Sequence, residues 1–355
     1  MRYTGLINHY KDRLPVDENT NFISLGEGNT PLIRLENIPA LLGKDVDIYV
    51  KYEGLNPTGS FKDRGMTMAV TKAVEAGSKA IICASTGNTS ASAAAYAARA
   101  GIKAFVLIPE GKIALGKLAQ AMIHGAVIIQ IKGNFDDGMR LVKEVAEHAP
   151  VSIVNSINPF RLQGQKTASF EIVEELGDAP DYHCLPVGNA GNISAHWMGY
   201  KEYQQDGKAT KTPAMVGYQA EGSAPFKKGE MIDNPETIAT AIRIGHPQSW
   251  DLAHEVERES NGWFDALSDA DILSAQKLLT EKEGIFCEPA SATSLAGAMR
   301  DIKSGKIPEG SKIVCTLTGH GLKDPDTAIA QCNNDNMIHI DPVMEEVKRA
   351  ILDNM

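Results

Sequence analysis

The sequence has no apolar run that approaches the roughly 18 residues of a membrane-spanning helix. Its first residues lack the apolar stretch and small-residue cleavage site of a signal peptide, so we expect a cytoplasmic protein. Positively charged residues are in the minority: the sequence has 35 Lys and Arg residues and 45 Asp and Glu residues, which gives a net charge of −10. This balance argues against nucleic-acid and anionic-membrane partners, while it leaves room for a local basic pocket that binds a small anion.

Cysteine is sparse as well. The five cysteines are odd in number and scattered, and several, such as Cys83, lie in apolar runs. The sequence contains no CxxC motif and no Cys/His cluster with zinc-binding spacing. We therefore expect buried free thiols in a reducing cytoplasm, and no metal site. Low-complexity segments and repeats of solenoid period are also missing from the sequence.

What the sequence does contain is a regular alternation of short apolar strands and helices. A chain of 355 residues is long enough for two domains, and strands with few polar residues between helices indicate parallel sheets covered on both faces. We predict an α/β protein with two domains, each an open, mostly parallel, twisted sheet covered by helices. The smaller domain is predicted to span residues 60–155, and the larger one residues 1–59 together with 156–355. Within the larger one, residues 163–176 are expected to form a single helix and residues 221–247 to be irregular.

One lysine directly follows a turn, in the segment Asn56-Pro57-Thr58-Gly59-Ser60-Phe61-Lys62-Asp63-Arg64-Gly65-Met66. Pro57 and Gly59 mark the turn, and Ser60 is expected to cap the helix that follows. Lys62 then falls in the first helical turn, where the helix dipole disfavours a cation and burial acts in the same direction. A neutral lysine amine is a nucleophile and forms Schiff bases. Taken alone, the segment is also compatible with an ordinary surface lysine beside a helix cap.

Three further loops follow predicted strands and are rich in small polar residues, at the edge where α/β sheets bind ligands. The first, residues 84–92, offers the amide of Asn88. The second is Gly188-Asn189-Ala190-Gly191-Asn192, whose backbone N–H groups and following helix dipole can form an anion cradle for a phosphate monoester. The third places the Thr318 hydroxyl at a strand end, where it can meet the edge of a flat ring. Each loop alone also fits a structural role. His320 in the third loop could act as a general base, but a single histidine in a glycine loop is more often a structural group.

Together the four segments supply what pyridoxal 5′-phosphate requires. This cofactor needs a lysine for its aldehyde, a dipole cradle for its phosphate, a donor for its phenolic oxygen and a partner for its pyridine nitrogen. Lys62, the 188–192 loop, Asn88 and Thr318 are predicted to fill these roles in that order, in the cleft between the two domains. A neutral hydroxyl at Thr318 is expected to leave the pyridine nitrogen less protonated than a carboxylate would, which weakens the ring as an electron sink.

The chain resembles the fold-type-II pyridoxal-phosphate enzymes (the tryptophan synthase β-like family), and within them the threonine synthases of the short, bacterial type. The resemblance covers about residues 20–330, and its markers are residues 27–32, 56–65, 85–89, 188–192, 288–292 and 317–324. The Asp63-Arg64-Gly65 continuation, the phosphate loop with asparagines and the Thr318 site point to the synthases. Related dehydratases tend to have an all-glycine phosphate loop and a serine at the last site.

The resemblance implies the conversion of O-phospho-L-homoserine and water to L-threonine and phosphate, by γ-elimination and β-addition of water, as the last step of threonine biosynthesis. It implies that Lys62 holds the cofactor as a Schiff base and carries protons between substrate carbons. The substrate phosphate then needs a second anion site, for which an arginine offers bidentate binding. The candidates are Ser85, Thr86, Thr89, Lys117, Asn155, Ser156 and Arg161. For Lys117, a solvated helix face is an equally good interpretation.

Two alternatives stay open at this point. One is a threonine or serine dehydratase of the same fold, and the other is a ligand-binding or regulatory protein that kept the fold without the chemistry. A homodimer is usual for similar enzymes and is expected here. The amphipathic segment 342–352 is expected to pack against the body of the protein or against a partner subunit.

Overall fold

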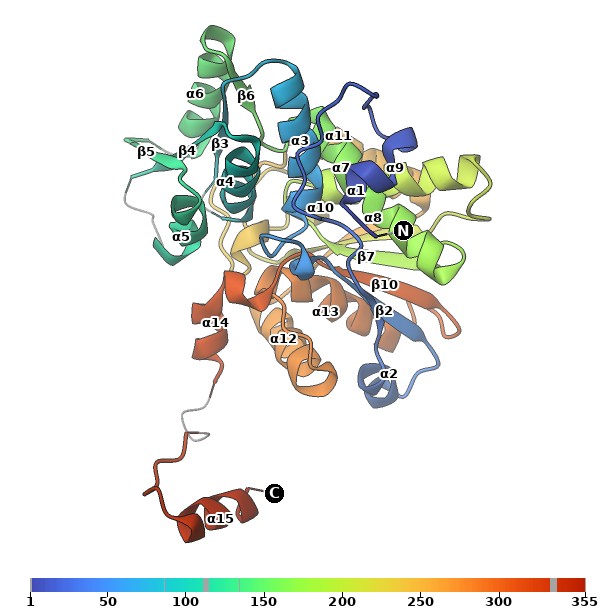
Figure 1. Ribbon diagram of the computed structural model, residues 1–355. Coiled ribbons are helices and arrows are strands. Elements are labelled where there is room, and N and C mark those ends of the chain that lie inside the picture. Colours follow the sequence, from blue (N-terminus) through green and yellow to red (C-terminus); the bar gives the residue numbers. More distant parts are fainter. Residues whose placement is uncertain (1, 86, 111–114, 134, 333–336, 355) are drawn as a thin grey trace. The chain divides into compact units, whose positions relative to one another are not determined.

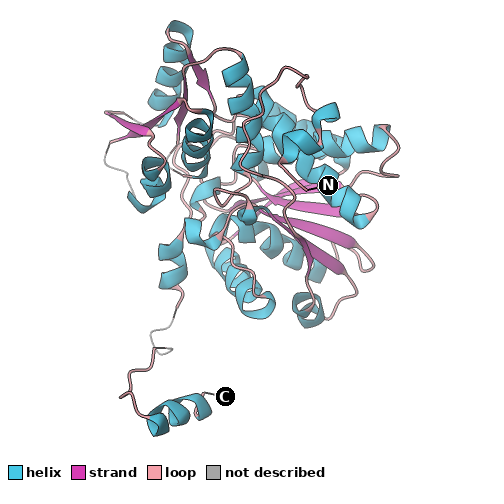
Figure 2. Ribbon diagram, in the orientation of Figure 1, coloured by secondary structure: helices cyan, strands magenta, loops and turns pink. Residues whose placement is uncertain are grey.

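The computed structural model describes residues 2–85, 87–110, 115–133, 135–332 and 337–354, without the side chains of 115–117 and 135–136. Contacts divide the chain into two compact units, Met1–Lys323 and Asp324–Met355. The first unit contains two β-sheets, each flanked by helices (Figure 2). The predicted α/β class with two mostly parallel sheets is therefore confirmed.

The larger sheet has six strands in the order β1-β2-β10-β7-β8-β9. The strands are β1 (Leu32–Arg34), β2 (Asp47–Tyr52), β7 (Tyr182–Pro186), β8 (Ala214–Ala220), β9 (Trp263–Leu267) and β10 (Lys312–Leu317). All neighbouring pairs are parallel except β1 with β2. Successive side chains point to opposite faces, so Cys184 packs under the helices α12 (Asp269–Glu283) and α13 (Pro289–Lys303), and Leu185 packs on the other face.

The opposite face of this sheet is covered by three helices, α8 (Thr167–Leu176), α9 (Gly191–Gln205) and α11 (Trp250–Ser260). Figure 1 shows α12 and α13 on one side of the sheet and α8 and α9 on the other. A parallel sheet buried on both faces needs apolar side chains on both faces, which is why β7, β8 and β10 read as nearly continuous apolar runs.

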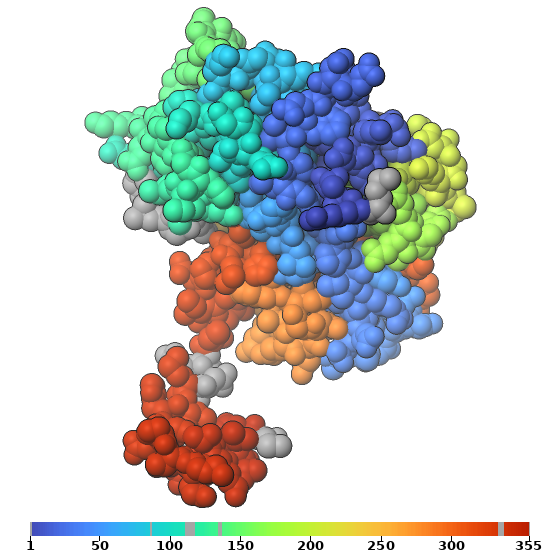
Figure 3. Space-filling model, viewed as in Figure 1, coloured from blue at the N-terminus to red at the C-terminus, as the bar shows by residue number. Residues whose placement is uncertain are grey.

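The smaller sheet has four parallel strands in the order β5-β4-β3-β6. They are β3 (Ala80–Ala84), β4 (Lys103–Pro109), β5 (Val127–Ile131) and β6 (Val151–Ile153). The helices α3 (Lys62–Glu75), α4 (Asn88–Ala100) and α5 (Leu115–Ile123) cover one face, and α6 (Phe135–His148) covers the other. On the face seen in Figure 3, dark-blue residues near the N-terminus lie beside the teal α4, where Tyr96 and Arg99 donate hydrogen bonds to residues 24–27.

The strands of the smaller sheet all lie within residues 60–155, and those of the larger sheet lie outside this range. Contacts nevertheless hold both sheets in one compact unit. The division into domains at these boundaries therefore stays a prediction. No helix among the described residues combines the length and the apolar character needed to cross a membrane.

Several local predictions differ from the structure. Residues 163–176 form two helices, α7 (Pro159–Gln165) and α8, which meet at Lys166. Strand β9 was not expected, because its alternating, half-buried pattern at the sheet edge is a weak signal in sequence. Of the five free cysteines four are buried, but Cys332 is exposed, so the expectation of five buried thiols is wrong.

The remaining elements are short. They are α1 (Leu6–His9), α2 (Asn37–Leu42), α10 (Pro225–Lys228), α14 (Pro325–Ala330), α15 (Met344–Leu352) and the 3₁₀ turns η1 (Lys11–Arg13), η2 (Glu53–Leu55), η3 (Thr240–Ile242) and η4 (Gly321–Lys323). The α10 and η3 elements lie in the segment that was expected to be irregular. In the C-terminal unit, α15 carries exposed apolar side chains such as Val347 and Ile351, so the predicted amphipathic helix is present.

A buried ion-pair network holds the start of α3 to the rest of the protein. Arg64, only 1% exposed, donates to both carboxylate oxygens of Glu53, at 2.6 and 2.8 Å, and to both of Glu171, at 2.6 Å. Lys51 pairs with Glu171 at 2.8 Å. Burial alone would raise the pKa of Glu171, but Arg64 and Lys51 lower it to about 2. Two cations and two anions therefore compensate one another inside the protein.

We expect the substitution Arg64→Ala to destabilise the protein by about 3–5 kcal/mol, because it leaves two carboxylates buried without their main partner. Urea unfolding monitored by circular dichroism measures the change. Arg140→Ala serves as the control, since the ion pairs that Arg140 makes with described residues of α6 are exposed and its loss should leave the midpoint nearly unchanged. Equal effects of the two substitutions would contradict the importance of the buried network.

Candidate active site

Lys62 opens helix α3 beside a small ladder of backbone hydrogen bonds. The N–H of Phe61 donates to the carbonyl of Thr318 at 2.9 Å, and Ser60 forms a β-bridge with Gly319. On the other side, the N–H of Glu288 donates to the carbonyl of Gly319 at 3.0 Å. The lysine turn, the Thr318 loop and the segment at Glu288 are far apart in the sequence but lie side by side. The backbone pairing fixes the position of the lysine turn along the Thr318 loop.

The three residues after Lys62 explain how the turn is built. Asp63 accepts hydrogen bonds from the N–H and the hydroxyl of Thr58, both at 2.6 Å, and from Ser92 at 2.6 Å. Arg64 enters the ion-pair network. Ser60, which was expected to be the helix cap, is not, because the N-cap position falls on Phe61 and the Lys62 N–H lies 3.4 Å from the Ser60 hydroxyl. The shorter hydrogen bonds of the turn are therefore those of Asp63, and Ser60 contributes one long hydrogen bond from a position before the N-cap.

Gly65 allows α3 to cross α7 at very short distance. A Cβ atom on Gly164 of α7 would lie 1.8 Å from the carbonyl oxygen of Arg64, and one on Gly65 would lie 3.0 Å from the carbonyl oxygen of Arg161. Only glycine fits at such a crossing. The close approach brings Arg161, which is 2% exposed, next to the helix that carries Lys62.

Arg161 is a buried cation that is only partly satisfied. One of its terminal nitrogens donates to the carbonyl of Val154 at 3.2 Å, while its Nε has no hydrogen-bond partner among the residues that the structure describes. Burial lowers the pKa of Arg161 to about 10, so the side chain is still charged at neutral pH. A buried guanidinium with an unused donor fits an anionic ligand, such as a phosphate group.

The charges around Lys62 act in opposite directions. Burial, followed by the positive charge of Arg161, lowers the pKa of Lys62 to about 7, and the carboxylate of Glu288 opposes this shift. The amine is therefore balanced between its two protonation states near neutral pH. A group in that position can act as a nucleophile and as a carrier of protons.

The predicted phosphate loop leads from β7 into α9. Ala190, directly before α9, has the left-handed backbone conformation (φ 64°), so this position falls on an alanine and not on one of the two glycines. Gly188 is needed for space, because a Cβ there would lie 3.1 Å from the Cα of Ile242. The first N–H groups of α9 have no acceptor within the helix, and such groups form an anion cradle.

The asparagines of this loop have different surroundings. Asn189 binds the following segment, because its side-chain oxygen accepts from the N–H of Gln248 at 3.2 Å. Asn192 donates to Gln165 at 3.1 Å, and its Oδ1 is buried without a partner within the described part of the chain. Oδ1 can only accept a hydrogen bond, so it adds nothing to the binding of an anion. The cradle of backbone N–H groups at residues 188–192 is what fits the phosphate end of pyridoxal 5′-phosphate.

Asn88, the first residue of α4, donates through Nδ2 to both carboxylate oxygens of Glu288, at 3.0 and 3.2 Å. A carboxylate only accepts hydrogen bonds, so this contact fixes which way the amide faces. Nδ2 carries two hydrogens, and a single hydrogen shared between the two carboxylate oxygens would leave the second for the phenolic oxygen of the cofactor. The predicted role of Asn88 is compatible with this geometry and stays a prediction.

Thr318, 5% exposed, follows β10 and lies 2.9 Å from the hydroxyl of Ser291 on α13. His320, two residues further on, stacks on Tyr52 and accepts a hydrogen bond at Nδ1 from the N–H of Leu322 at 3.1 Å. These contacts favour a structural role for His320. They leave Thr318 as the hydroxyl that can face the pyridine nitrogen.

The proposed substrate residues gather at the carboxyl edge of the smaller sheet. Asn155, after β6, exchanges two hydrogen bonds at 3.0 Å with the backbone of Ala84 at the end of β3, so it ties together the loops that start with Ser85 and Ser156. Thr89 lies in the first turn of α4. Thr86 and the side chain of Lys117 lie outside the described residues. The structure thus brings Ser85, Asn155 and Ser156 to one edge, with Arg161 on the helix that follows.

Sequence reasoning did not assign a role to Glu288 or Ser291. The available signal was the start of α13, where Glu288 occupies the N-cap position but makes no side-chain cap hydrogen bond. Ser, Thr, Asp and Asn are the usual residues there, so a glutamate before a proline indicates that its carboxylate serves another partner. That partner, Asn88, is 200 residues away in sequence and could not be identified without the fold.

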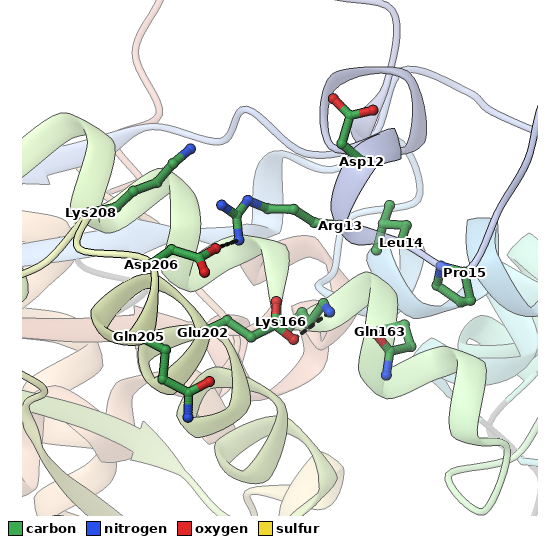
Figure 4. A pocket seen from close by; sticks show the side chains of 10 residues that line it. All are labelled: Asp12, Arg13, Leu14, Pro15, Gln163, Lys166, Glu202, Gln205, Asp206 and Lys208. Carbon is green, nitrogen blue, oxygen red and sulfur yellow. Dashed lines mark hydrogen bonds and ion pairs between the residues drawn. The ribbon is translucent and has the colours of Figure 1, made fainter.

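A pocket of about 610 Å³ lies elsewhere, between η1, the end of α7 with its junction to α8, and the C-terminal half of α9 (Figure 4). Its walls carry the ion pairs Arg13–Asp206 and Lys166–Glu202, both at 2.6 Å. None of the predicted site residues lines it. The pocket is therefore separate from the chemistry around Lys62.

Comparisons with known proteins identify the family and the fold of the chain. A profile of the family described as "Pyridoxal-phosphate dependent enzyme" matches residues 23–319. Threonine synthase from Synechocystis sp. is 57% identical and covers 99% of this chain and 91% of its own, and threonine synthase from Halalkalibacterium halodurans is 56% identical and covers 100% and 98%. Cysteine synthase from Entamoeba histolytica has the same fold, with a TM-score of 0.76 at 20% identity over 90% of this chain and 94% of its own. The resemblance inferred from the sequence is confirmed.

We expect Lys62 in the cofactor-free protein to react with acylating reagents with a midpoint near pH 7, because its neutral fraction falls as the pH drops below its pKa of about 7. Arg161→Met should move this midpoint to higher pH and Glu288→Gln to lower pH, since they remove charges of opposite sign. Mass spectrometry of the Lys62 peptide after timed labelling measures the midpoint. Shifts in the same direction for both variants would refute the electrostatic account.

Proposed function

Because the chain belongs to the pyridoxal-phosphate-dependent enzymes, we propose that it converts O-phospho-L-homoserine and water to L-threonine and phosphate, which is threonine synthase activity. Relatives named threonine synthase that are 56–57% identical over nearly the full length support this reaction. Within the fold, the observation that carries it is the buried, partly unpaired Arg161 beside Lys62. A reaction that releases phosphate needs such a second anion site, apart from the 188–192 loop.

The residues divide the work as follows. The 188–192 loop, Asn88 and Thr318 hold the phosphate, the phenolic oxygen and the pyridine nitrogen of the cofactor, and Lys62 holds its aldehyde carbon. The bound cofactor supplies electron withdrawal. Lys62 moves protons among the substrate carbons, for which its pKa of about 7 suits both uptake and release at neutral pH. Arg161, together with Ser85, Thr89, Asn155 and Ser156, holds the substrate phosphate, and Thr86 and Lys117 are further candidates for this group.

The direct test is an assay with purified protein, pyridoxal 5′-phosphate and O-phospho-L-homoserine that follows phosphate and L-threonine together. Equal release of both products supports the proposal. The second candidate, a threonine or serine dehydratase, would release ammonia from threonine or serine and no phosphate from phosphohomoserine. Arg161 favours the synthase, because neither dehydratase substrate carries a phosphate.

We further propose a cytoplasmic homodimer, as expected for enzymes of this kind. Analytical ultracentrifugation of the full chain distinguishes a dimer from a monomer. Neither nucleic acid nor membrane is proposed as a partner, in line with the acidic composition.

Lys62→Ala should abolish turnover while the protein remains folded, because it removes the amine that binds the cofactor and carries protons. The visible absorbance of the bound cofactor should change, and borohydride reduction, which should attach the cofactor to Lys62 in the unaltered protein, should attach none. Circular dichroism verifies the fold. Turnover that survives in this variant would remove Lys62 from the proposed role.

Arg161→Gln should raise the KM for O-phospho-L-homoserine by about 10- to 100-fold, the effect of losing hydrogen bonds to a charged group. Inhibition by inorganic phosphate should weaken in parallel, and the absorbance of the bound cofactor should persist. Arg99→Gln, on the exposed end of α4, is the control. It should leave the KM for O-phospho-L-homoserine and the inhibition constant for inorganic phosphate unchanged. An unchanged phosphate inhibition in Arg161→Gln would place the anion site elsewhere.

A further inference from the structure

A pair of buried hydroxyl groups, Ser291 and Thr318, forms a short hydrogen-bonded chain that ends on the backbone of Gly319. The two hydroxyl oxygens are 2.9 Å apart, and either can be the donor. The N–H of Gly319 donates to the Ser291 hydroxyl at 2.9 Å, and that hydroxyl also lies 3.3 Å from the carbonyl oxygen of Gly319. Ser291 is 0% exposed and Thr318 is 5% exposed, so bulk water does not compete for these contacts.

The hydroxyl hydrogens of Ser291 and Thr318 can be arranged in two ways that leave no donor unused. In the first, Ser291 donates to Thr318, and the Thr318 hydrogen is left to donate to a neutral ring nitrogen. In the second, Thr318 donates to Ser291, Ser291 donates to the carbonyl of Gly319, and Thr318 is left to accept from a protonated ring nitrogen. Each hydroxyl has one hydrogen and two lone pairs, so both arrangements use every donor.

We propose that Ser291 is a positioning residue that allows Thr318 to bind the pyridine nitrogen of the cofactor in both its neutral and its protonated form. This inference rests on the proposed function, in which Thr318 faces that nitrogen. The second arrangement contains one more proton than the first, and this proton comes from water. The carbonyl of Gly319 is essential, because it accepts the Ser291 hydrogen in the second arrangement.

The proposal addresses a weakness of a neutral hydroxyl as ring partner. A hydroxyl that could only donate would hold the ring neutral and limit its capacity to withdraw electrons, whereas the reaction develops charge at more than one carbon. Charged groups nearby also bias the balance. Glu288, whose carboxylate would lie 2.4 Å from a Cβ on Gly319, favours the protonated ring, while Lys62 opposes it when charged. His320 and Lys323, on the loop and 3₁₀ turn that follow, are the other titratable groups close by.

A matched control lies one helical turn further along α13. The hydroxyl of Ser294 donates to the carbonyl of Ser291 at 2.9 Å and lies 3.1 Å from that of Thr316, and it is 0% exposed. Ser294→Ala therefore removes a buried hydroxyl from the same helix without removing a partner of Thr318. Ser291→Thr keeps a hydroxyl at the position of interest and tests for rescue.

The experiment loads the full protein with pyridoxal phosphate labelled with ¹⁵N in the ring and follows the nitrogen resonance against pH by NMR. In the unaltered protein, the nitrogen should titrate between both forms within the pH range in which the protein is folded. Ser291→Ala should lower the pKa of the ring nitrogen by about one unit, which corresponds to the loss of one hydrogen bond that the protonated form needs. Ser294→Ala and Ser291→Thr should titrate like the unaltered protein.

Three results would overturn the proposal. The first is a ring nitrogen in the unaltered protein that stays in one form at every pH, a measurement that does not depend on whether any variant folds. The second is an unchanged titration in Ser291→Ala. The third is a shift in Ser294→Ala as large as in Ser291→Ala, which would indicate a general packing effect. A protein that binds no cofactor at all would refute the proposed function together with this inference, whereas normal turnover with an unchanged titration would refute only the role of Ser291.

Discussion

The geometry around Lys62 depends on the ion-pair network of Arg64 with Glu53 and Glu171. Arg64 lies two residues after Lys62, and its guanidinium binds η2, which precedes the turn, and α8, which covers the larger sheet. A hydrophobic contact between these elements would allow sliding, whereas a bidentate pair on each side fixes both distance and angle. The position of the lysine is therefore determined by charges that take no part in the chemistry.

This constraint gives a physical meaning to the motif around the lysine. In the sequence, Asp63-Arg64-Gly65 served only as a marker of the family resemblance. The structure shows what each of the three residues does. Asp63 stabilises the turn by its hydrogen bonds with Thr58, and Arg64 fixes the turn to α8 by its ion pair with Glu171. Gly65 leaves room for α7, which carries Arg161, to pack closely. Most strands and helices and the glycine loop before α9 were predictable, because apolar periodicity and glycine-rich strand ends depend on local sequence. The edge strand β9 and the break between α7 and α8 were not.

What the sequence could not predict depends on contacts between distant segments. Ser60 has the right residue type for a helix cap, but pairing with Gly319 takes its backbone into a β-bridge and moves the helix start to Lys62. The left-handed position in the phosphate loop fell on Ala190, although glycine is the residue that adopts this conformation most readily. Glu288 and Ser291 act on Asn88 and Thr318 only after α13 has been placed against the lysine turn.

The same placement sets the basicity of Lys62 and, under the proposed role of Arg161, would make it depend on the substrate phosphate. Arg161 and Glu288 lie on different elements, α7 and the start of α13, and shift the pKa of Lys62 in opposite directions. A phosphate dianion bound to Arg161, as proposed, would more than cancel the positive charge that lowers this pKa. Lys62 would then hold a proton more firmly while the phosphate is present and release it more easily after the phosphate has left. With Arg161 as the proposed anion site, the buried arginine would link the occupancy of that site to the direction in which the lysine moves protons.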